Sequence, residues 1–114
     1  MALWGYRPVR PEFEIADAKA DFKSAQTIEQ YHLSDRALYI PDKGLSWKYI
    51  PLDRIRGVIP GRDTRDEQGF MGGYHIDIPL IRVIYEGGVE VLTLEGTRQA
   101  EELFGRLKKD YGGI

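Results

Sequence analysis

The chain has 114 residues, the size of one domain, and its 42% hydrophobic and 30% charged residues are typical of a folded globular protein. It contains no cysteine, which excludes disulfides, thiolate catalysis and cysteine-bound metal centres. The formal charge of -2 argues against general nucleic-acid binding, because neutralising phosphates needs a basic surface.

No apolar run approaches the roughly 20 residues of a membrane span, and the first residues lack the hydrophobic stretch of a secretory signal. We therefore expect no transmembrane segment and a cytoplasmic location.

The first eleven residues combine large apolar side chains with Pro8 and Pro11, which favour extended backbone. We predict that residues 1–11 form an N-terminal arm, docked on the body of the domain or on a second copy. Its candidate interface residues are Leu3, Trp4 and Tyr6. Residues 12–114 would form the single domain, in which residues 12–23 fit either a strand or a short helix.

Alternating apolar and polar residues then predict strands over 25–33, 36–40, 45–50 and 55–59. Pro60 is expected to end the fourth strand. The polar, glycine-rich residues 61–73 are predicted to be a loop, in which the apolar pair Phe70 and Met71 is a candidate contact.

Strands at 74–78 and 80–85 are expected to be separated by a break or bulge at Pro79. Gly87 and Gly88 predict a tight hairpin to a strand at 89–94. The last element is an amphipathic helix with Thr97 as N-cap, whose apolar face carries Ala100, Leu103, Phe104, Leu107 and Tyr111.

The fold class predicted by this order is mainly β, with about seven antiparallel strands followed by one C-terminal helix. Such an order fits either a split barrel closed by the helix or an open sheet with the helix on one face. The segments YHLSDRALYI (31–40) and WKYIPLDRI (47–55) resemble bacterial pleckstrin-homology-like (PH-like) and GRAM-like domains. The resemblance covers roughly residues 25–110 and extends to the closing hairpin at 81–88 and the helix at 100–109. It implies a split barrel capped by the helix, in a scaffold that binds proteins, peptides or lipid head groups and is usually not catalytic.

Members that bind phosphoinositides place several basic residues around the first hairpin, whereas here Arg36 stands alone beside Asp35. This departure argues against phosphoinositide binding. Four arginines are nevertheless close in sequence and are candidates for binding a phosphate or an acidic partner: Arg54, Arg56, Arg62 and Arg65. Because acidic residues interleave with them, a self-compensated surface is the competing interpretation.

His32, His75 and Asp77 offer the ligand types of a metal site, but their spacing is not specific, and a polar surface pair is the simpler interpretation. Three serines are available for a catalytic triad, although none stands in a Gly-x-Ser-x-Gly turn. We therefore expect no cofactor, no metal and no catalysis. The leading hypothesis is a module that binds proteins and could self-associate, and the alternative is a membrane-surface binder in which Phe70 and Met71 insert beside the four arginines.

Overall fold

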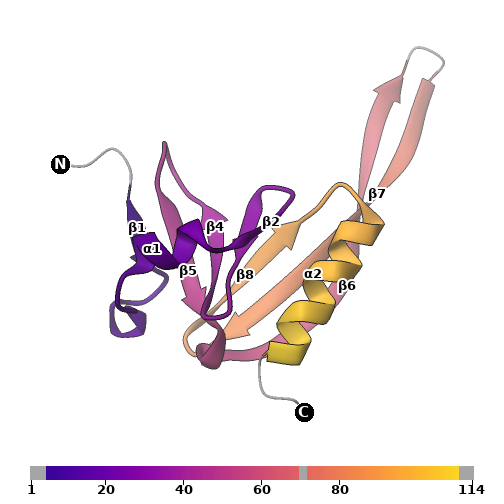
Figure 1. Ribbon diagram of the computed structural model, residues 1–114. Coiled ribbons are helices and arrows are strands. Elements are labelled where there is room, and N and C mark those ends of the chain that lie inside the picture. Colours follow the sequence, from indigo (N-terminus) through magenta and orange to yellow (C-terminus); the bar gives the residue numbers. More distant parts are fainter. Residues whose placement is uncertain (1–4, 70–71, 111–114) are drawn as a thin grey trace.

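The computed structural model describes residues 5–69 and 72–110, in which eight strands form two sheets (Figure 1). The five-stranded sheet has the order β1-β5-β4-β3-β2, and the three-stranded sheet has the order β6-β7-β8. The strands of the first sheet are β1 (Tyr6–Pro8), β2 (Gln26–Ile28), β3 (Tyr31–Leu33), β4 (Ala37–Pro41) and β5 (Trp47–Pro51). The strands of the second sheet are β6 (Ile55–Gly69), β7 (Gly72–Tyr85) and β8 (Gly88–Thr93).

The predicted class, mainly β with a C-terminal helix, is confirmed, and the two sheets do not close into a barrel. Helix α2 (Thr97–Asp110) follows the last strand and packs on β6 and β7. Its fully buried Leu103 and Leu107 join a core that also takes Leu38 from the five-stranded sheet and Val83 from the three-stranded one. This one core unites the two sheets and the helix.

Residues 25–33 form a hairpin rather than the predicted single strand. Glu29 has a φ of 53°, in the left-handed region, and the chain turns there between β2 and β3. In one straight strand Ile28 and Tyr31 would point to opposite faces, whereas the turn lets the core bury both. The Glu29 carboxylate accepts the amide hydrogens of Glu95 at 2.8 Å and Gly96 at 2.9 Å, so it anchors the loop before α2.

The described part of the N-terminal arm lies on the body of its own chain. Strand β1 pairs in parallel with β5, so the sheet is not wholly antiparallel as predicted. Short elements follow in η1 (Pro11–Phe13) and in α1 (Ala18–Lys23), the helical alternative for residues 12–23. Tyr6 and Phe22 pack against buried Tyr39 and Tyr49 on the face of the five-stranded sheet away from the main core. The N-terminal segment thus covers this second face.

Candidate functional site

The predicted loop at 61–73 is wrong for its described residues, because β6 and β7 continue through this region as one long antiparallel hairpin. Strand β8 pairs with β7 only from Tyr85 to Leu80, so the rest of the hairpin has two strands. We call this part the ribbon: residues 62–69 of β6 and 72–79 of β7. Figure 1 shows this part projecting from the body. At about 3.3 Å per residue, its eight residues on each strand correspond to a length of about 25 Å.

Neither proline interrupts the β6–β7 ladder, contrary to the predicted break at Pro79 and strand end at Pro60. The Leu94 amide donates to the Pro79 carbonyl at 3.0 Å, so the backbone polar groups of Pro79 face the β8 side. Because the N–H and C=O of a strand residue point the same way, Pro79 lacks a donor only on that side. Pro60 lies two residues from Arg62, which is the register partner of Pro79. By the same alternation, the N–H that Pro60 lacks would face the outer edge of β6, away from β7.

The outer face of the three-stranded sheet carries exposed apolar side chains around Arg82. Three register rows place Gly57, Ile84 and Val89 side by side, then Ile59, Arg82 and Val91, then Gly61, Leu80 and Thr93. Ile59, Val89 and Val91 are each about half exposed. The predicted strand at 89–94 gave no sign of this face, because β8 carries apolar residues on both of its faces.

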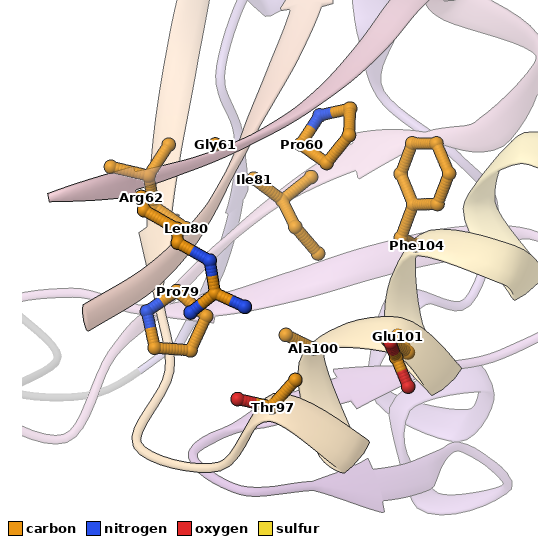
Figure 2. Close-up of a pocket in the computed structure, with 10 residues that line it drawn as sticks. All are labelled: Pro60, Gly61, Arg62, Pro79, Leu80, Ile81, Thr97, Ala100, Glu101 and Phe104. Atoms are coloured by element: carbon orange, nitrogen blue, oxygen red, sulfur yellow. The ribbon is translucent and has the colours of Figure 1, made fainter. Parts of the chain in front are cut away.

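A groove of about 310 Å³ runs between the base of the ribbon and α2 (Figure 2). The ten residues that line it are Pro60, Gly61, Arg62, Pro79, Leu80, Ile81, Thr97, Ala100, Glu101 and Phe104. Its walls are mainly apolar, and Figure 2 shows the exposed Arg62 on the strand side and Glu101 on the helix side. Sequence reasoning identified only Arg62 of this set, because the groove joins segments distant in sequence.

The structure does not gather the predicted arginines into one site. Arg54 lies in η2 (Leu52–Arg54), where its guanidinium stands 5.3 Å from the centre of the Phe13 ring. Arg56 stands at a bulge at the start of β6, and Arg62 is six residues further along the strand, about 20 Å away. A single phosphate cannot contact all three, so the arrangement gives the lipid alternative no direct support.

The other candidates divide between the described residues and those outside them. Tyr6 packs inside its own chain, with its ring centre 5.0 Å from that of Phe22. Leu3, Trp4, Phe70 and Met71 lie outside the described residues, and Arg65 is described only as backbone, opposite Ile76 in the ribbon register.

The structure places His32 and Asp77 in different sheets. His32, on β3, packs against the rings of Phe22 and Trp47 at centre distances of 4.5 and 4.9 Å, and burial lowers its pKa. Asp77 is exposed on the ribbon. The side chain of His75 lies outside the part of the chain that the structure describes. Within the described part of the chain no three His, Asp or Glu side chains are grouped to hold a metal ion.

One serine does meet a carboxylate, in a contact that docks α1. The Ser34 hydroxyl donates to Asp21 Oδ2 at 2.5 Å, and the Tyr39 hydroxyl donates to the same oxygen at 2.7 Å. Ser34 Oγ also accepts the amide hydrogens of Arg36 and Ala37, which shapes the turn before β4. Burial and the neighbouring Asp21 raise the pKa of Tyr39. These contacts hold α1 on the sheet.

Comparison of the chain with family models, curated proteins and solved structures found no match in any of the three. The PH-like and GRAM-like resemblance therefore stays a prediction. Among the described residues, no helix has the length and apolar character needed to span a membrane.

Proposed function

We propose that the protein is a non-catalytic interaction module that binds other proteins, copies of itself included, through the ribbon. The observation that carries the proposal is the ribbon itself, two strands that extend beyond the edge of β8 and of the core. A two-stranded hairpin alone is marginally stable in water, and a third strand or a packed face stabilises it. A partner that supplies either would be bound by the ribbon.

Two further features support a binding role. The radius of gyration, 15.5 Å, exceeds the roughly 13 Å expected of a compact domain of this length, because the ribbon lies outside the body. At the base of the ribbon, the groove beside α2 and the outer face of the three-stranded sheet offer apolar surface continuous with it. Surfaces of this kind are typical of protein contacts.

The polar contacts among the described residues support a non-catalytic role. The group whose pKa is raised most, the Tyr39 hydroxyl, is engaged in holding α1 through Asp21. Asp42, whose pKa is lowered by the backbone amide of Lys43 and by Arg7, lies in an exposed ion pair with Arg7 beside β1. These contacts join elements of the fold, so the Tyr39 and Asp42 side chains are already engaged by Asp21 and Arg7.

A shortened variant tests the proposal. Residues 64–77 are replaced by Asn-Gly between Asp63 and Ile78, which are register partners that a two-residue turn can join. We expect the variant to keep the circular dichroism spectrum and thermal midpoint of the body, since the core lies outside the ribbon. It should lose self-association in light scattering, and partners captured by the full chain should be depleted at least tenfold in quantitative capture. Undiminished self-association and an unchanged partner set would contradict the proposal.

A further inference from the structure

We propose that the ribbon uses the outer edge of β7, over residues 72–78, to bind the same edge of a second copy as an antiparallel pair about a two-fold axis. The inference rests on the proposed function and names its partner. The two edges of the ribbon differ in how their backbone donors are directed and engaged.

The β7 edge of the ribbon is unpaired within the described chain. Strand β8 ends its pairing at Leu80, and the Leu94 amide occupies the Pro79 carbonyl. Pro79 shows which residues face this edge, because backbone direction alternates along a strand. Residues 73, 75 and 77 therefore direct both N–H and C=O toward this edge. Pro79 has no N–H, so a partner strand can pair with β7 only as far as this residue.

The β6 edge, in contrast, lacks two donors near the body, although Arg62, Asp66 and Gln68 also face it. The residues that face it on this side of the bulge include Pro60, Arg62 and Thr64, by the same alternation. Pro60 has no N–H, and the Thr64 amide already donates to its neighbour Asp63 Oδ1 at 2.9 Å. Proline is one of the means by which proteins prevent pairing at an exposed edge. The β7 edge therefore offers an unbroken row of donors at residues 73, 75 and 77, whereas the row on β6 is interrupted at Thr64.

The window 72–78 is self-complementary. A two-fold axis at residue 75 places residue 73 of one copy opposite Asp77 of the other, so that residues with outward donors meet one another. The two ribbons become one four-stranded sheet. Ile76 and Ile78, half-buried on the same face as Leu80, would come from both copies to form an apolar stripe on that face. Isologous pairing of this kind closes a dimer, in which the two β6 strands form the outer edges of the joined sheet.

Cysteine cross-linking tests the register, because the natural chain has no cysteine. In the double variant Gly73→Cys/Asp77→Cys, each new thiol would face its counterpart across a hydrogen-bonded pair, about 5.5 Å between Cα atoms, which a disulfide can span. Within one chain the two positions are about 13 Å apart, too far for a disulfide. The matched control is Thr64→Cys/Gln68→Cys, at the register partners of 77 and 73 on β6.

We expect mild oxidation to give a covalent dimer from the β7 variant and at least tenfold less from the β6 control. A second pair of variants tests the monomer–dimer equilibrium. Asp77→Pro removes an outward-facing N–H of β7, and Thr64→Pro removes the outward-facing N–H of its register partner on β6. Sedimentation equilibrium should show a dimer that weakens at least tenfold with Asp77→Pro only, while circular dichroism confirms that both variants stay folded.

Preferential cross-linking of the β6 control, or greater weakening by Thr64→Pro, would overturn the β7 assignment. A natural chain that is monomeric up to millimolar concentration would overturn the self-pairing. That result would leave the proposed function standing if capture of a different protein still depended on the ribbon, so the two failures are distinguishable.

Discussion

Replacing Tyr39 by phenylalanine should destabilise the protein by about 1.5–3 kcal/mol, the range for hydrogen bonds to charged groups. The Tyr39 side chain is fully buried, and its hydroxyl donates to Asp21 Oδ2 at 2.7 Å and approaches the Ala18 carbonyl at 3.2 Å. The variant keeps the ring and leaves the carboxylate with the Ser34 hydroxyl alone. Urea unfolding followed by tryptophan fluorescence gives the free energy of unfolding, with an unchanged slope if the native state stays compact.

A matched control is Tyr49→Phe, since Tyr49 packs on the same face and its hydroxyl accepts the Ile15 amide hydrogen at 3.1 Å. That bond joins neutral groups, so its loss should cost only about 0.5–1.5 kcal/mol. In a double-mutant cycle, Tyr39→Phe and Ser34→Ala should be non-additive because both donate to Asp21. A smaller cost for Tyr39→Phe than for Tyr49→Phe, together with strict additivity, would refute the assignment of Asp21 as the anchor of α1.

Three further predictions concern the N-terminal segment, β3 and the last hairpin. Deleting residues 1–11 removes β1 from the edge of β5, so the urea midpoint should fall, and an unchanged midpoint would mean that this strand adds nothing to stability. Burial lowers the pKa of His32 below its usual value near 6.5, so the unfolded chain binds this proton first as pH falls. Stability should therefore decrease below about pH 6.5, and His32→Gln should flatten this dependence in urea midpoints measured from pH 5 to 7.5; an equal slope in both chains would exclude His32. Gly87 has a φ of 99°, so Gly87→Ala should lower the free energy of unfolding by about 1–2 kcal/mol, whereas Gly105→Ala in α2 should be neutral or stabilising.

The fold class was predictable because burial leaves a periodic signal in the sequence. Ala100, Leu103 and Leu107 fall at helical spacing and are all buried, and proline and glycine mark the β4–β5 and β7–β8 hairpins, although the second turn lies at Glu86 and Gly87 rather than at 87–88. The strand at 25–33 failed for a related reason. Its alternation continues through Glu29, a residue that seldom takes positive φ and so gives no turn signal.

The ribbon was not predictable from the same signals. A strand exposed on both faces needs no alternation of apolar residues, and its polar, glycine-rich composition matches that of a loop. The prolines added to the error, because a proline ends a strand only where its missing donor is needed. Whether Pro60 and Pro79 face a partner strand depends on pairing between distant segments, which composition does not reveal.

The groove and the arginines show that contacts between segments distant in sequence were equally unpredictable at the candidate site. Arg54, Arg56 and Arg62 are close in sequence but follow an extended strand, so the structure separates them. Pro60 and Phe104 are distant in sequence yet line one groove, because α2 packs back on β6. Proximity in sequence wrongly predicted one charged site formed by the arginines, and it gave no sign of the apolar groove beside α2.

The edges of the two sheets differ in how far their backbone donors are protected from pairing, and this difference bears on the role of the ribbon. On the five-stranded sheet, both edge strands are only three residues long, and β1 ends in Pro8. Beside β8, Glu90 forms an ion pair with Lys48 of the other sheet at 2.9 Å. On β6, Pro60 and the Asp63 contact remove donors. Short strands, prolines and charges are devices that prevent edge pairing. The ribbon part of β7 also carries a charge, at Asp77, but its outward donors at residues 73, 75 and 77 form an unbroken row. That row is the observation that supports pairing through β7 rather than through β6.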